Sequence, residues 1–102
     1  MESWQPVTVG ELEAIVARQL RACSPEQQEA FENYRVAFYR VPLSRFGSIE
    51  HALVVAEIPT GLLYFEDVEY GFEVGILGPD GVLPDKGCSQ LELTHALARS
   101  GL

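Results

Sequence analysis

Residues 64–75 read YFEDVEYGFEVG, and four acids alternate there with aromatic residues and valines. From position 67 to 76 the odd positions hold acids and glycines, whereas the even positions hold Val68, Tyr70, Phe72, Val74 and Ile76. A period of two is typical of a strand with one side in the core and the other in water. Glu66 breaks the alternation, which predicts a bend or bulge beside Asp67. The first interpretation of this stretch is therefore the solvated side of an antiparallel sheet.

More strand signals lie on either side of this stretch. Segments rich in β-branched and aromatic residues predict strands at residues 35–43, 49–58, 62–66 and 70–77. Turn-forming residues separate or end them, PTG at 59–61 and GPDG at 78–81. Residues 35–39 could also continue a preceding helix, because Phe31, Tyr34, Phe38 and Val41 fit a helical period. That alternative stays open.

Three capping boxes predict helices before and after the strands. Each is a Ser or Thr followed three residues later by Glu or Gln: Thr8 with Glu11, Ser24 with Gln27, and Ser89 with Glu92. We expect helices at about residues 9–22, 25–34 and 90–99. Two N-terminal helices, a run of strands and one C-terminal helix predict an α+β fold. Its form would be an antiparallel meander of about four strands, with the helices packed on one face.

The length and composition of the chain predict a single globular domain over residues 1–102. The chain is long enough to bury its own core, and 47% of its residues are hydrophobic. Its N-terminus has no basic segment followed by an apolar one, and no apolar run approaches the length of a membrane span. Cys23 and Cys88 are expected to be free thiols. These features predict a cytoplasmic protein that does not enter a membrane.

The negative charge is concentrated in the middle of the chain. The net charge is −8, and residues 46–85 hold eight acids and no Lys or Arg. Such a field repels the phosphate backbone, so nucleic acid is not an expected partner. It would instead steer a basic protein toward the chain.

The acidic strand supplies our leading functional hypothesis, a surface for a basic protein partner. Its predicted residues are Tyr64, Glu66, Asp67, Glu69 and Glu73, with Tyr64 near the rim. Small inhibitors and immunity-type antitoxins use acidic surfaces in this way, an analogy at the level of protein class only. We therefore favour a small protein-binding or regulatory module over an enzyme.

The same acids do not form a recognisable metal or acid–base site. Carboxylates two positions apart on one strand point in parallel, about 7 Å from each other, whereas hard cations need converging oxygens. The two histidines and two cysteines have no zinc-binding spacing, and no phosphate-binding loop occurs. The sequence thus predicts no metal and no cofactor.

Two alternatives remain open. The first is a thiol- or carboxylate-dependent enzyme using Cys88, His51 and a nearby acid, because a thiol beside a helix N-terminus can have a lowered pKa. His95 would lie about 10 Å along that helix, too far for direct proton transfer. The second is a homo-oligomer, such as a homodimer that pairs edge strands or the segment 34–46 across a two-fold axis.

Overall fold

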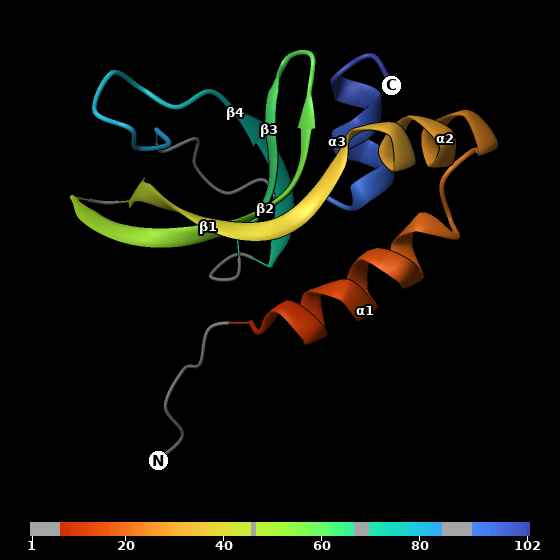
Figure 1. Ribbon diagram of the computed structural model, residues 1–102, viewed down its shortest axis with the longest axis horizontal. Helices are drawn as coiled ribbons and strands as arrows, with labels where there is room; N and C mark the ends of the chain where they lie inside the picture. The colour runs from red at the N-terminus through yellow and green to blue at the C-terminus, as the bar shows by residue number, and fades with distance from the viewer. Residues whose placement is uncertain (1–6, 46, 67–69, 85–90) are drawn as a thin grey trace.

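Two helices, four strands and a third helix follow one another in the computed structural model of the chain (Figure 1). The structure describes residues 7–45, 47–66, 70–84 and 91–102. The helices are α1 (Val9–Leu20), α2 (Pro25–Tyr34) and α3 (Leu93–Arg99), and the strands are β1 (Arg35–Arg45), β2 (Ser48–Ile58), β3 (Gly61–Glu66) and β4 (Gly71–Gly75). These strands form an antiparallel sheet in the order β1-β2-β3-β4. The predicted α+β fold is confirmed.

The first two helices begin where their capping boxes predict. The hydroxyl of Thr8 accepts from the N–H of Glu11, and the Glu11 carboxylate accepts from the N–H of Thr8. Ser24 and Gln27 repeat this exchange at the start of α2. The pKa of Glu11 is lowered, first because its carboxylate accepts the backbone N–H of Thr8. Local hydrogen bonds therefore define both starts.

The third helix begins later than predicted, and its expected capping box is wrong. Helix α3 starts at Leu93, after an N-cap Glu92 that makes no side-chain cap hydrogen bond, and Ser89 lies outside the described residues. Leu91 is still extended, because its carbonyl accepts from the N–H of Phe72 in β4 at 2.8 Å. Gln19 of α1 instead accepts the N–H of Leu93 at 2.6 Å. A long-range contact thus replaces the local cap.

Residues 35–39 belong to the strand and not to a continued helix. Arg35 follows the last residue of α2 and already has extended backbone angles, with φ −64° and ψ 149°. Arg35 pairs with Ala56 and Tyr39 pairs with Val54, so the three residues between them in β1 lie opposite one residue of β2, Val55. This irregularity is a bulge near the N-terminal end of β1.

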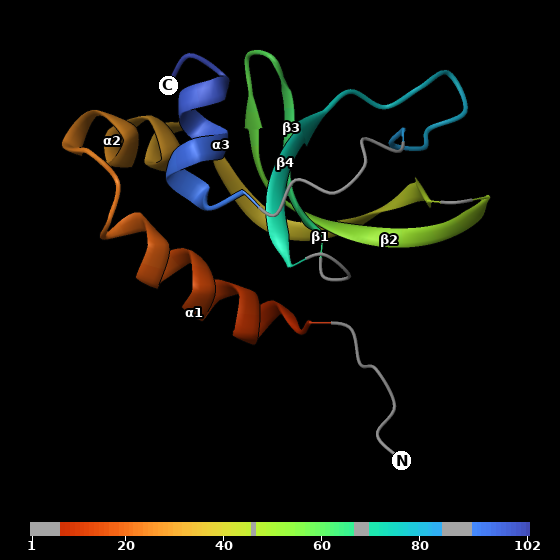
Figure 2. The same cartoon turned by 180° about the vertical axis from the view of Figure 1, so that it is seen from behind.

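All three helices cover one side of the sheet, the helix side, as predicted (Figures 1 and 2). A large apolar core lies between them and the strands. Its buried members include Leu12, Val16, Phe31, Leu53, Val55, Leu63, Phe65, Phe72, Leu93 and Leu97. The rings of Phe65 and Phe72 meet edge to face with centroids 5.0 Å apart. Burial of this apolar set is the main source of the fold's stability.

The opposite side of the sheet, the outer side, holds a second and smaller apolar cluster. It consists of Val41, Leu43, Ala52, Val54, Tyr64 and Leu83. Leu83 reaches the sheet because the chain turns back at residues 78–81, where the N–H of Gly81 donates to the carbonyl of Gly78. Leu83 then forms a parallel bridge with Leu43. The outer side is therefore partly covered, whereas the sequence predicted a solvated one.

The predicted alternation holds only at the centre of β4. Phe72 is fully buried, and Val74 packs against the large core. Tyr70 has φ 60° and precedes the strand, and Ile76 follows its end and is 70% exposed, so both lie outside the core. Gly75 is buried under Leu83. A Cβ at this position would lie 3.2 Å from the Leu83 side chain. The predicted burial of Tyr70 and Ile76 was therefore wrong at the strand ends, and the predicted exposure of Gly75 was wrong under Leu83.

Candidate functional site

The five predicted partner-binding residues do not share one exposed surface. Tyr64 is 2% exposed, and Glu66 is 7% exposed. Glu73 is half-buried, whereas Asp67 and Glu69 lie outside the described residues. Tyr64 is therefore buried, whereas it was expected near an exposed rim, and Glu66 is buried as well. Tyr64 packs with Leu83 of the covering segment in the outer cluster.

Glu66 forms a buried ion pair. Its Oε2 lies 2.9 Å from Nη2 of Arg45, and Arg45 is only 5% exposed. The Nε of Arg45 lies 3.4 Å from Oε2 of Glu50, which is half-buried. Buried charges need such partners, because removal from water costs several kcal/mol per ion. Arg45, Glu50 and Glu66 therefore form a charged cluster with a structural role at this end of the sheet.

Glu73 in β4 pairs directly with Tyr64 in β3, so the two side chains are neighbours on the outer side of the sheet. One of its carboxylate oxygens, Oε1, accepts from the N–H of Val74 at 3.0 Å. Glu73 also borders a hollow of about 410 Å³ near the C-terminal end of α3, where Arg99 is another lining residue. Arg99 and Glu73 therefore border the same hollow.

A pair that the sequence did not indicate lies at the other end of the outer side. The hydroxyl of Tyr39 in β1 donates to Oε2 of Glu57 in β2 at 2.8 Å. Tyr39 is 37% exposed, and Glu57 is exposed. The pKa of Tyr39 is raised to about 12, first by desolvation of its hydroxyl and then by its hydrogen bond to the Glu57 carboxylate.

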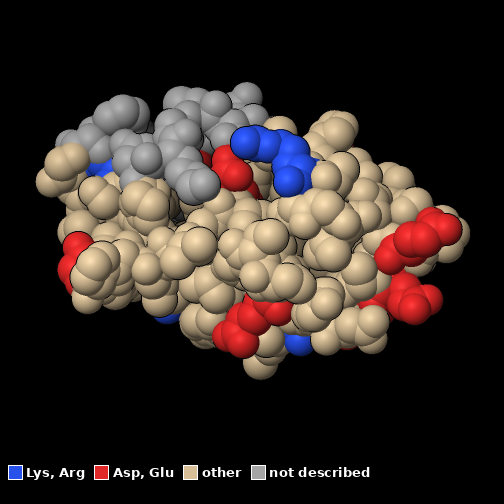
Figure 3. Space-filling view, turned by 90° about the horizontal axis from the view of Figure 1, so that it is seen from above, with Lys and Arg blue, Asp and Glu red and all other residues tan. Residues whose placement is uncertain are grey.

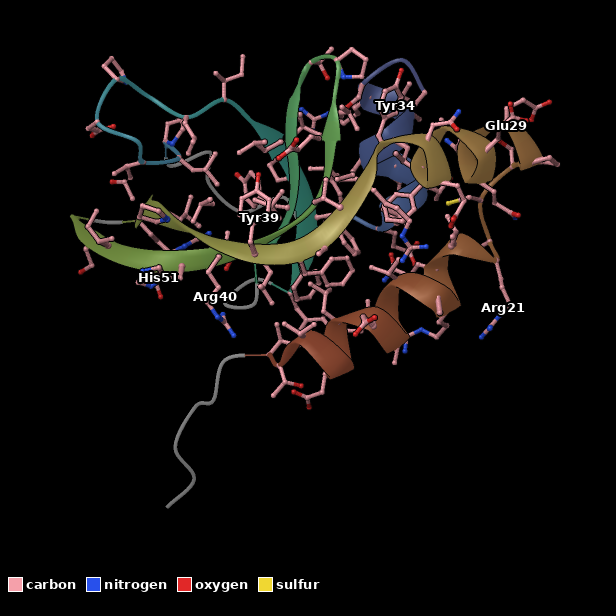
Figure 4. All side chains as sticks on the ribbon, in the orientation of Figure 1. Arg21, Glu29, Tyr34, Tyr39, Arg40 and His51 are labelled. Carbon is pink, nitrogen blue, oxygen red and sulfur yellow. The ribbon has the colours of Figure 1, made fainter. Side chains whose placement is uncertain are left out.

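Figure 4 shows Tyr39 and Arg40 on opposite sides of β1. Tyr39 pairs with Val54, a member of the outer cluster, so its ring lies on the outer side. Arg40 points the other way and donates through Nη2 to the carbonyl of Val7. The strand therefore presents an aromatic ring with a carboxylate on one side and a base on the other.

The candidate thiol chemistry is not assembled in the described part of the chain. Cys88 lies outside it, and His51 and His95 are both exposed. Cys23 is buried, and burial raises the pKa of its thiol. Within the described ranges, no three His, Cys, Asp or Glu side chains are grouped to hold a metal ion.

Acidic side chains are spread over the surface. Figure 3 shows them in separate places, divided by uncharged residues. Of the five acids of residues 46–85 that the structure describes, Glu50 and Glu66 both pair with Arg45. Glu57 makes no salt bridge with a Lys or Arg of the described residues. Glu57 is therefore an exposed acid whose charge no described base offsets.

No protein-family model, curated protein or solved structure matches the chain. No helix in the described part of the chain is long and apolar enough to cross a membrane.

Proposed function

We propose that this chain is a small cytoplasmic protein-binding module whose acidic surface engages a basic protein. The observation that carries the proposal is the separation of charge along the chain. Residues 46–85 contain eight acids and no Lys or Arg. The described salt bridges of that segment all go to Arg45, a single base from outside it.

An excess of acidic side chains favours binding in two ways. It attracts a basic partner over a distance of about 10 Å at moderate salt, which raises the association rate. It also discriminates against acidic partners and nucleic acid, because like charges repel. Glu57 and Glu73, together with Asp67 and Glu69, are the acids we assign to this role.

The test is the capture of partners from a lysate of the source organism by the immobilised chain. Wild type is compared with Glu57→Lys/Glu73→Lys, and bound proteins are eluted with salt and identified by mass. We expect wild type to retain a basic protein that elutes at high salt and that the charge-reversed variant does not retain.

A second charge-reversed variant is the matched control. Glu26→Lys/Glu29→Lys changes the net charge by the same amount, but both residues are exposed on α2, outside residues 46–85. It should still capture the partner. Equal loss with both variants would reduce the effect to net charge, and undiminished capture by Glu57→Lys/Glu73→Lys would reject the proposal. Circular dichroism of each variant checks that the fold is intact.

A further inference from the structure

The outer edge of β1 has backbone groups that no described strand pairs with. Near its C-terminal end, Leu83 exchanges two hydrogen bonds of 2.9 Å with Pro42 and Ser44. The N–H and C=O of alternate residues in a strand point to the same edge, so Arg40 directs its backbone groups outward as well. Among the described residues, nothing continues the line of Leu83 along the rest of β1. An added strand could pair there.

On the helix side, a hollow flanks this edge. Its volume is about 480 Å³, and it is lined by Val9, Glu13, Arg35, Val36, Ala37 and Phe38. Arg35 lies over the ring of Phe31, 5.1 Å from its centroid, and Arg40 reaches Val7 on the same side of the strand. Four of the six lining residues are apolar, and Arg35 is already paired with Glu32 at 2.7 Å, so the hollow suits an apolar guest side chain.

On the outer side, the same edge favours a basic guest side chain. The exposed ring of Tyr39 lies beside the exposed carboxylate of Glu57, and the two are joined by a 2.8 Å hydrogen bond. A Lys or Arg of a neighbouring strand can stack on such a ring while it pairs with the carboxylate. The hydrogen bond holds the two groups in place before a partner arrives.

We propose that β1 binds an extended basic segment of the protein partner as an added strand. Side chains alternate between the two sides of a strand. The guest therefore has a Lys or Arg at the position over Tyr39 and Glu57, and its flanking residues, which face the hollow beside α1, are apolar. This inference rests on the proposed function and names the site and the pattern of the partner.

Charge complementarity favours such a partner over a second copy of the chain. A second copy has the same net charge of −8 and the same acidic segment. Pairing β1 with itself would also bring Arg35 and Arg40 of one strand beside those of the other. A basic guest strand instead offsets the Glu57 charge and places no base beside these arginines.

A displayed library of random nine-residue peptides, selected for binding to the whole chain, tests the pattern. We expect the enriched peptides to share a Lys or Arg between two apolar residues. Enriched peptides without this pattern, or no enrichment, would overturn the proposal.

Matched variants at Arg40 test the backbone pairing of an enriched peptide. Arg40→Pro removes the outward N–H without removing a hydrogen bond to β2, and Pro is tolerated at such edge positions, as Pro42 already shows. Arg40→Ala removes the same side chain but keeps the N–H. We expect Arg40→Pro to bind about 5- to 10-fold more weakly than Arg40→Ala. Glu57→Gln should weaken binding about 2- to 5-fold at low salt and less at high salt.

Equal affinities of Arg40→Pro and Arg40→Ala would reject strand addition at β1. Sedimentation supplies the other decisive result, because a wild-type dimer that Arg40→Pro dissociates would make a second copy the occupant. The lysate capture separates this inference from the proposed function. If Arg40→Pro still captures the basic protein and Glu57→Lys/Glu73→Lys does not, the acidic surface binds the partner and β1 does not.

Discussion

The two sides of the sheet differ in how much of their surface is covered by apolar packing. On the helix side, three helices bury a large and continuous apolar core. On the outer side, the segment at Leu83 covers a small cluster at one end, where the Arg45–Glu66 pair is also buried. The other end exposes Tyr39 and Glu57. The comparison shows that the helix side supplies stability, whereas the outer side combines a local closure with an accessible polar surface.

The largest expected effect is a truncation in the helix-side core. Phe72 is fully buried and packs on Phe65, so Phe72→Ala should lower the free energy of unfolding by about 3–5 kcal/mol. Leu83→Ala on the outer side is the comparison. It should cost about 2 kcal/mol, because the short covering segment can move inward and fill part of the cavity. Urea unfolding monitored by circular dichroism measures both, and equal losses would contradict the difference between the two sides.

The next effect concerns the buried charges of the outer side. Glu66→Ala leaves Arg45 without its 2.9 Å partner and should lower the free energy of unfolding by about 3 kcal/mol. The replacement of both partners, Arg45→Met/Glu66→Leu, removes the unpaired charge and should cost less than Glu66→Ala alone. Urea unfolding again supplies the measurement.

Glu50→Ala is the control for that comparison. Glu50 is half-buried and lies 3.4 Å from Arg45, so its loss should cost less than that of Glu66. If Glu50→Ala and Glu66→Ala are equally destabilising, burial does not determine the strength of the pair.

Local rules predicted the parts of the fold that depend on neighbours in the sequence. The caps at Thr8 and Ser24 act within three residues, and both helices begin where expected. The start of α3 depends on Leu91 pairing with Phe72, a contact that no short pattern contains. The Ser89 box matched the cap pattern, but the helix start that it predicted was wrong.

The site was harder to predict for a related reason. A period of two indicates which residues share a side of the sheet, but it does not indicate whether another segment covers that side. Tyr64 is buried in a cluster with Leu83, which folds back over the sheet after the turn at 78–81, and Glu66 is buried in its ion pair with Arg45. The Tyr39–Glu57 pair depends on a strand register that contains a bulge, so neither residue has a local signal.

The smallest predicted effect tests the exposed end of the outer side. The pKa of Tyr39 is raised to about 12 from the ordinary value of 10.0. A folded-state pKa above the unfolded one stabilises the fold fully below pH 10, and this contribution is lost as the pH rises toward 12. Tyr39→Phe lacks this group, so the stability of wild type should fall more steeply than that of the variant across this range. Urea unfolding at a series of pH values measures the difference.

Glu57→Gln separates the carboxylate from the burial of the ring. The amide can still accept the hydrogen bond of Tyr39, but it has no charge to oppose the phenolate. The pKa of Tyr39 should therefore fall below about 12 in this variant while remaining above 10.0, because desolvation is the first cause of the shift. Spectrophotometric titration of the tyrosines, with Tyr39→Phe as the reference, reads this directly. An unchanged titration would mean that the Glu57 charge does not act on Tyr39, and it would remove the electrostatic reason for a basic side chain to bind there.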